Sequence, residues 1–259
     1  MRKRDITLLC LALILLLVGL QVYFIPEIHE QRQKTQSEQI VESFFREHLP
    51  LETEQDLATV NESSEKQGKD LPYAELLQAM REYNAQIYYN GQAGLSDPWA
   101  YTSEVFDLSA YGLDSEMIGV LTIPKMALQE PVYLGATAAH LNKGVAQLSI
   151  SSMPIGGSDT NCVIAGHRGW DGALFFRHIE VLETGDEVLL TNLWETLHYR
   201  VCEIKIIQPY QAEQILIQPG RDLLTLLTCH PYGSGGQYRY AVFCERVPEE
   251  GSDLIAGRS

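Results

Sequence analysis

Residues 223–233 read LLTLLTCHPYG, an apolar run that ends in Cys229 and passes into a glycine-rich loop. A short run of leucine and threonine bounded by turn residues predicts a buried β-strand. A thiol at the end of a strand, beside a loop, is placed for reaction, whereas a thiol in the middle of a strand is not. From placement alone, a reactive cysteine and a half-buried structural cysteine both remain open.

Runs of the same kind recur on both sides of this segment, from Phe106 onward. Short strands at fairly regular spacing predict a closed or sandwiched β structure, so residues 105–248 are interpreted as one β-barrel domain. The runs are 118–123, 132–134, 162–165, 187–191, 198–207, 223–228 and 240–246. Residues 137–142 and 173–179 are the expected short helical insertions.

The residues before the barrel have a different pattern. Residues 27–48 place Ile40, Val41, Phe44 and Phe45 at helical spacing, which predicts a stalk helix, and the acidic residues 51–70 predict a linker. A second helix should begin near Pro72 and end at Asn90-Gly91, before a loop over 91–102. Its apolar stripe is formed by Leu76, Leu77, Met80, Tyr83 and Ile87. The expected segments are 1–26, 27–70, 71–104, 105–248 and a flexible tail at 249–259.

The first residues predict a membrane anchor. Met1 to Arg4 are basic, and residues 6–25 contain Gln21 as their single strongly polar residue, a length that matches a bilayer core. A cleaved signal peptide is the alternative, but no small-x-small site follows, and Tyr23 and Phe24 suit the membrane interface. We therefore expect a single-pass protein of the cell membrane whose basic end is cytoplasmic and whose barrel lies on the extracellular face.

Composition excludes some functions. With 19 Lys and Arg against 34 Asp and Glu, the formal charge is −15, which argues against a nucleic-acid partner. The sequence has no CxxC and no HxxxH, so its spacing supports no zinc site. The favoured interpretation of Cys162, Cys202 and Cys244 is small buried hydrophobic residues. An extracellular chain could also pair its cysteines, and that alternative stays open.

His167 is the candidate partner of the thiol. It lies in VIAGHRG (163–169), at the end of another apolar run, and an imidazole titrates near neutrality, as an acid/base partner must. His230 is the competitor because it adjoins Cys229. Neighbouring side chains on a strand point to opposite faces, so we expect His230 to point away from the thiol.

Arg239 is the candidate cation. It lies ten residues after Cys229, and a strand that returns beside the cysteine strand would bring its guanidinium near the thiol. A fixed donor at that place would stabilise the charge that develops on an attacked carbonyl oxygen. Arg168 and Arg246 are weaker alternatives. The order His, Cys, Arg differs from that of papain-like enzymes, and the caspase pentapeptide is absent.

Taken together, these segments resemble the sortase family. TLLTC at 225–229 is similar to the sortase TLxTC signature, GHR at 166–168 to the segment that carries the sortase histidine, and Arg239 to the sortase arginine. Further segments resemble class C, the pilin-polymerising sortases: MPIGG at 153–157 before GHRG at 166–169, CHPYG at 229–233, REYN at 81–84 and DPW at 97–99. The resemblance covers residues 72–247.

The resemblance implies a mainly β fold, a closed eight-stranded sortase-type barrel, and a cysteine transpeptidase without cofactor or metal. Cys229 would cut an LPxTG-like sorting signal after its threonine and hold the product as a thioester, with His167 as acid/base and Arg239 beside the oxyanion. An amine would release it: a pilin lysine in class C, a cell-wall peptide amine in anchoring sortases. Asp97 would pair with Arg239, and Trp99 would cover Cys229, as a lid.

Two departures from class C leave the acceptor amine open. Residues 247–259 contain no second apolar span of the kind that class C members usually carry, and the loop between Cys229 and Arg239 is one residue longer. The alternatives are a housekeeping-type sortase that anchors proteins to the wall, a non-catalytic membrane-tethered binding module, and a secreted cysteine hydrolase.

Overall fold

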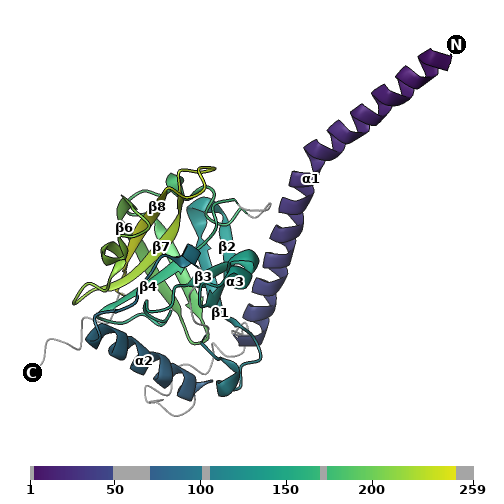
Figure 1. Cartoon of the computed structure of the whole chain (residues 1–259). Coiled ribbons are helices and arrows are strands. Elements are labelled where there is room, and N and C mark those ends of the chain that lie inside the picture. Colours follow the sequence, from purple (N-terminus) through teal and green to yellow (C-terminus); the bar gives the residue numbers. More distant parts are fainter. Residues whose placement is uncertain (1–2, 49–70, 101–105, 170–173, 249–259) are drawn as a thin grey trace, which may run out of the picture.

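The computed structural model describes residues 3–48, 71–100, 106–169 and 174–248 (Figure 1). The predicted linker at 51–70 and the predicted tail at 249–259 lie outside these described residues.

Eight strands of the described chain form one closed barrel, in the order β1-β2-β3-β4-β7-β8-β6-β5. Closure leaves no free sheet edge, and it confirms the barrel expected from the sequence. The strands are β1 (Met117–Ile123), β2 (Leu128–Leu134), β3 (Val145–Gln147), β4 (Thr160–Ala165), β5 (Glu187–Asn192), β6 (Thr196–Ile207), β7 (Asp222–His230) and β8 (Tyr238–Arg246).

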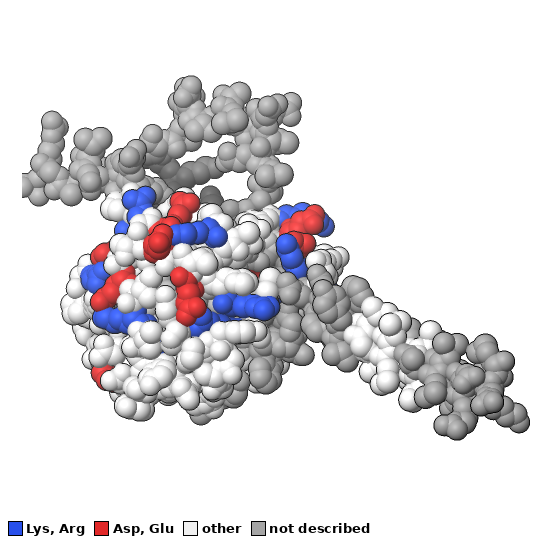
Figure 2. All heavy atoms as spheres, turned by 90° about the horizontal axis from the view of Figure 1, so that it is seen from above, with Lys and Arg blue, Asp and Glu red and all other residues white. Residues whose placement is uncertain are grey.

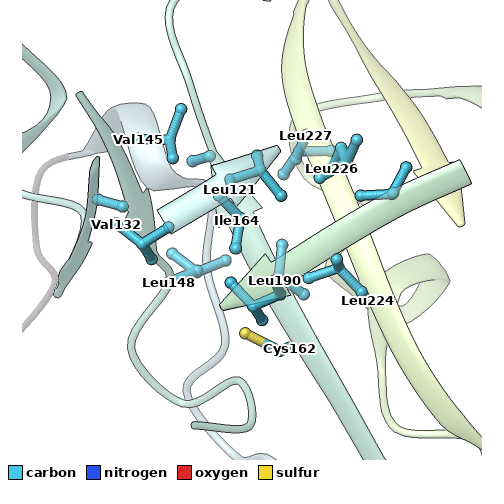
Figure 3. Packing of buried hydrophobic residues seen from close by; sticks show 14 of the residues in the cluster. Leu121, Val132, Val145, Leu148, Cys162, Ile164, Leu190, Leu224, Leu226 and Leu227 are labelled. Atoms are coloured by element: carbon cyan, nitrogen blue, oxygen red, sulfur yellow. The ribbon is translucent and has the colours of Figure 1, made fainter. Parts of the chain in front are cut away.

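The strand that contains Cys229 is buried on both faces. Residues 223–228 of β7 are all buried, and so are all six residues of β4, its parallel neighbour. A strand covered on both faces reads as a continuous apolar run instead of an alternating one, which explains the run LLTLLT. Figure 3 shows Ile164, Leu190 and Leu224 in the same core, each fully buried.

Two local expectations were incomplete or wrong. Strand β3 was missed, because three residues are too few to show a period. The helix expected at 137–142 is present as α3 (Ala138–Lys143), with the Thr137 side chain accepting from the His140 amide. The helix expected at 173–179 was wrong: residues 175–178 form turns, and a 3-10 segment follows at Ile179–Val181.

Two helices lie outside the barrel. α1 (Lys3–His48) is one continuous helix whose C-terminal part lies beside β2, while its N-terminal part projects away from the barrel (Figure 1). Its Val41 and Phe44 are buried against the core, as their spacing predicted. Among the residues that the structure describes, no helix has a stretch both long and apolar enough for a membrane span. Anchoring by residues 6–25 therefore stays a prediction.

α2 (Ala74–Tyr89) lies against one end of the barrel and positions the segment that follows it. Its predicted stripe is buried, with Tyr83 half-buried. The Tyr83 hydroxyl accepts from the Ile150 amide at 2.9 Å, and the Asn84 side-chain oxygen accepts from the Met153 amide at 2.7 Å. These bonds attach the helix to the loop that precedes β4.

Acidic and basic side chains are interspersed on the face shown in Figure 2, and neither sign of charge gathers in one place there. The excess of acidic residues therefore gives no single charged patch on that face.

Candidate active site

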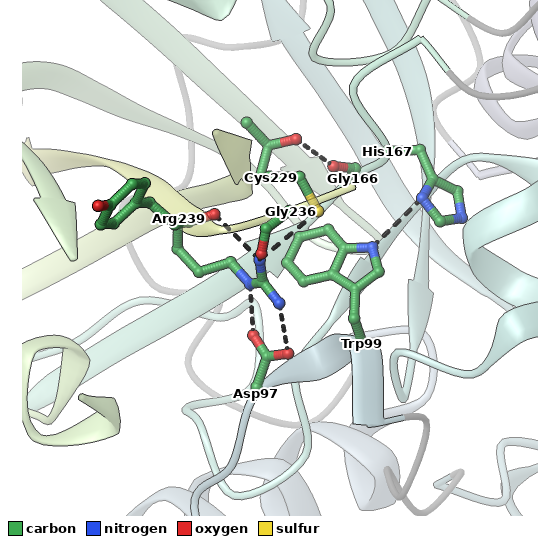
Figure 4. A network of polar contacts seen from close by, with 9 residues as sticks. Asp97, Trp99, Gly166, His167, Cys229, Gly236 and Arg239 are labelled. Carbon is green, nitrogen blue, oxygen red and sulfur yellow. Dashed lines mark hydrogen bonds and ion pairs between the residues drawn. The ribbon is translucent and has the colours of Figure 1, made fainter. Parts of the chain in front are cut away.

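Three neighbouring strand ends bring the predicted residues together. Cys229 of β7 lies directly opposite Arg239 of β8 in the antiparallel ladder. On the other side of β7, the parallel ladder with β4 ends at the pair Ala165 and Leu227, so His167 and Cys229 each lie two residues beyond it. The three candidates, distant in the chain, thus share one end of the barrel (Figure 4).

The guanidinium of Arg239 points at the thiol. Its Nη1 donates to Cys229 Sγ over 3.8 Å, and to the carbonyl oxygens of Gly236 at 2.8 Å and Tyr238 at 3.0 Å. The two carbonyl bonds fix the position of Nη1 beside the sulfur. Of the three arginines considered from the sequence, Arg239 is therefore the one placed beside Cys229 Sγ.

Asp97 binds the same guanidinium from the opposite side. Arg239 Nε donates to Asp97 Oδ1 at 2.6 Å and Nη2 donates to Oδ2 at 2.7 Å, which makes a two-pronged, charge-assisted pair (Figure 4). The Arg239 side chain is 7% exposed and that of Asp97 is 18% exposed. The carboxylate thus neutralises the cation inside the site.

Trp99 lies across the site, between Cys229 and His167. It belongs to a short 3-10 turn (Pro98–Ala100), and its Nε1 donates to His167 Nδ1 at 3.3 Å. The Arg239 guanidinium stacks on its ring at 4.6 Å from the centroid. Figure 4 shows the indole between the Cys229 sulfur and the His167 ring. We name residues 97–99 the lid.

In this closed arrangement the site favours neutral groups. Burial raises the pKa of the Cys229 thiol, and the Asp97 carboxylate raises it further. The positive charges of Arg239 and Arg168 oppose this rise. Burial lowers the pKa of His167. A neutral thiol beside a neutral imidazole is thus preferred over the thiolate–imidazolium pair while the lid is in place.

His230 points away from the thiol, as strand alternation predicted. Its Nδ1 accepts from Arg168 Nη1 at 2.9 Å and lies 3.2 Å from Glu180, while its ring packs beside Tyr240. Arg246 binds Glu195 and Asp222, near the far end of the strands.

Gly236 is a residue of the site that the sequence did not identify. Its φ is +84°, and a methyl group there would lie 3.0 Å from Arg239 Nη1 and 3.1 Å from Cys229 Sγ. Only glycine leaves room for both groups. The glycine-rich loop after Cys229 was visible in the sequence, but nothing distinguished this glycine from its neighbours.

We expect Gly236→Ala to slow alkylation of Cys229 by about tenfold or more, because the methyl displaces the thiol and its cation. Gly235→Ala is the matched control: its φ is +70°, but a methyl there meets nothing within 4 Å. Both variants carry similar backbone strain, so equal rates would show that the close approach is unimportant.

Gln92 ties the base of the lid to two other loops, and no pattern in the sequence indicated it. It is buried with a φ of +52°; its Nε2 donates to Ile150 O at 2.9 Å, and its Oε1 accepts from the Ile217 amide at 2.5 Å. The lid is thus anchored to the β6–β7 loop and to the loop before β4.

The other described cysteines are separate from this site. Cys162, Cys202 and Cys244 are free thiols, the first and last of them buried. Burial raises the pKa of all three thiols, and raises those of Cys162 and Cys244 well above the ordinary value. In the described part of the chain, no group of three or more His, Cys, Asp and Glu side chains could hold a metal ion.

Comparison with known proteins agrees with this geometry. The Sortase domain family matches residues 121–247, which contain β4, β7 and β8. Sortase D of Bacillus subtilis (strain 168) is 30% identical over 131 residues, 50% of this chain and 63% of that protein. The chain spans about half to two thirds of the length of the curated relatives it matches.

Solved structures extend the similarity over more of the fold. Sortase C1 of GBS Pilus Island 1 is 31% identical with a TM-score of 0.62, and the match covers 70% of this chain and 86% of that one. Sortase C-1 from Actinomyces oris is 30% identical with a TM-score of 0.56, covering 66% and 99% respectively. The chain therefore belongs to the sortase family of cysteine transpeptidases.

Proposed function

We propose that the protein cleaves an LPxTG-like sorting signal, holds the product as a thioester on Cys229 and transfers it to an amine, most simply a pilin lysine. The observation that carries the proposal is the convergence of His167, Cys229 and Arg239 at three adjacent strand ends, with Arg239 Nη1 3.8 Å from the thiol. The pilin acceptor is supported by relatives named as pilus sortases.

Each step uses a group already in place. The Cys229 thiolate attacks the threonine carbonyl carbon, and Arg239 donates to the oxygen that becomes negative. The imidazolium of His167 gives its proton to the leaving amine nitrogen, and the C–N bond breaks to leave the thioester. His167 then takes a proton from the incoming amine, whose nitrogen displaces the Cys229 sulfur.

The lid opposes the first step. Arg239 cannot bind a substrate oxygen while Asp97 occupies its Nε and Nη2, and Trp99 lies where the peptide must pass between thiol and imidazole. A bound substrate therefore has to displace both side chains. Departure of Asp97 shifts the balance toward the thiolate–imidazolium pair, because one influence that raises the thiol pKa leaves with it.

The function is tested with the purified protein and a labelled peptide that carries an LPxTG signal. We expect a covalent adduct on Cys229, and then a new amide when a pilin domain with an accessible lysine is added. A product formed only with a cell-wall peptide amine would indicate the anchoring type of sortase. Release to water alone would indicate a hydrolase, and the absence of any adduct would reject the proposal.

We expect Asp97→Asn to raise alkylation of Cys229 and peptide hydrolysis by about tenfold, since a hydrogen bond to a charged group contributes about 1.5–3 kcal/mol. Loss of the Asp97 charge also lowers the pKa of the thiol. The alkylation rate should therefore rise at a lower pH than in the unchanged protein, whose thiol pKa is raised.

Trp99→Ala should act in the same direction, because the indole no longer covers the site. Asp107→Asn is the control, since this exposed carboxylate accepts from Ser109 and lies outside the lid. An unchanged or slower reaction in both lid variants would contradict a closing role.

We also propose that residues 6–25 anchor the protein in a membrane, with the barrel outside. The apolar sequence of this stretch supports the proposal, and its described side chains Leu13, Ile14 and Leu15 are exposed on α1. Deletion of residues 1–26 should release the protein from sedimented membranes. Equal sedimentation of both forms would count against an anchor.

A further inference from the structure

Arg168, the residue after His167, is a buried cation that the mechanism above does not use. Its side chain is 3% exposed, and its Nη2 binds Glu180 at 2.6 Å, a carboxylate that is 50% exposed. Its Nη1 donates to the main-chain oxygen of Cys229 at 3.3 Å and to His230 Nδ1 at 2.9 Å. One guanidinium therefore joins the two strand ends that carry the thiol and the imidazole.

This contact lies where the ladder no longer holds the strands. The paired register of β4 and β7 stops at Ala165 and Leu227. Two further bonds follow it: the Gly166 amide donates to Leu227 O at 3.1 Å, and Thr228 Oγ1 donates to Gly166 O at 2.7 Å. Beyond these bonds the two chains continue to His167 and Cys229. Arg168 provides a direct bond between them at that level.

Stability alone does not account for this arginine. A buried ion pair often contributes no more than well-packed apolar residues, because its desolvation cost offsets its attraction. Arg168 Nε is moreover buried with no hydrogen-bond partner in the described chain, which adds a further cost. The bonds from Arg168 to the two strand ends therefore indicate a role in holding them in place.

We propose that Arg168 is a positioning residue that fixes the main chain of Cys229 against the strand end bearing His167, with Glu180 holding the guanidinium from behind. The proposal rests on the proposed function for its catalytic meaning. Its charge also favours the thiolate, and unlike Arg239 it stays in place when a substrate carbonyl takes the other guanidinium.

The test compares Arg168→Met, Arg168→Lys and Glu180→Gln. We expect Arg168→Met to lower single-turnover acylation by about tenfold or more with KM little changed, because a small misplacement of reacting groups has a large effect on rate. Arg168→Lys should recover part of the loss, since it keeps the charge, and Glu180→Gln should show a smaller loss in the same direction. Thermal melting reports the fold.

Arg221→Met is the matched control, because Arg221 binds Glu245 near the opposite end of β7. If Arg168→Met does not fold, the Lys and Gln variants decide. Wild-type rates in folded Arg168 variants, or losses that only follow the melting temperature, would overturn the proposal.

Alkylation by iodoacetamide against pH supplies a readout that needs no peptide. Loss of the Arg168 charge should move the rise in rate to higher pH, whereas a purely structural role would leave it in place. The comparison requires that the other groups around the sulfur are the same in every variant. These groups are Arg239 on β8, Asp97 and Trp99 on the lid, His167, and Glu180 behind Arg168. A wild-type protein that alkylates normally but never forms a peptide adduct would reject the function and leave the alkylation comparison to decide on Arg168.

Discussion

Replacement of Cys229 by alanine is expected to abolish capture of a sorting-signal peptide and to reduce its cleavage by at least about 10⁴-fold, the loss typical of removing a nucleophile. The thiol is the attacking atom, and no other described cysteine is placed to substitute for it. Cys162 and Cys244 are buried in the core, and Cys202 donates to Phe243 O on a neighbouring strand. Intact-mass spectrometry of the peptide adduct measures the effect.

Cys202→Ala is the matched control, since it removes a half-buried thiol of the same barrel without touching the site. It should form the adduct at the rate of the unchanged protein. The fold should persist in Cys229→Ala, because Cys229 lies near the end of β7 and its side chain is not part of the buried hydrophobic core. A peptide adduct on Cys229→Ala, or cleavage at the normal rate, would refute the assignment of the nucleophile.

Removal of the guanidinium in Arg239→Ala should lower single-turnover acylation by about 10²–10³-fold, the range for loss of one oxyanion donor. The variant also loses the partner of Asp97, so the lid opens more readily and the thiol becomes accessible. The acylation rate should therefore fall while the accessibility of the Cys229 thiol rises. Faster access with slower acylation is the signature of the proposed role.

The double variant Asp97→Asn, Arg239→Ala separates the two effects. If Arg239 acts on the carbonyl oxygen, the double variant stays slow in acylation, because an open lid cannot replace the donor. The acylation rate of Arg239→Lys should lie between those of Arg239→Ala and the unchanged protein, since an ammonium keeps the charge but not the fork of donors. Acylation by Arg239→Ala within threefold of the control Arg221→Ala would contradict a role for Arg239 at the carbonyl.

The barrel was predictable because its strands leave a direct trace in the sequence. β7 and β4 are parallel and covered on both faces, so each reads as an unbroken apolar run with polar residues at its end. Cys229 and His167 were found for that reason: each is the first chemically active residue after such a run. The pairing with Arg239 followed from the expectation that the next strand returns beside β7.

The remaining residues of the site were hidden because their roles depend on contacts distant in the sequence. Gly236 is one of several glycines in its loop, and only the distances to Sγ and Nη1 single it out. Arg168 was considered as a rival to Arg239, whereas the structure places it on the Cys229 carbonyl. Asp97 and Trp99 were indicated by resemblance alone; in isolation DPW reads as an ordinary turn.

The parallel pairing of β4 with β7 determines when the site can exist. Parallel neighbours need a long crossover, and here β5 and β6 lie between β4 and β7 in the sequence. The ladder that aligns His167 with Cys229 therefore depends on contacts between distant residues, and it cannot form early in folding. β8 must then return beside β7 before Arg239 reaches the sulfur. A growing or partly folded chain therefore carries an isolated cysteine, and the thiol acquires its imidazole and guanidinium neighbours only when the barrel closes.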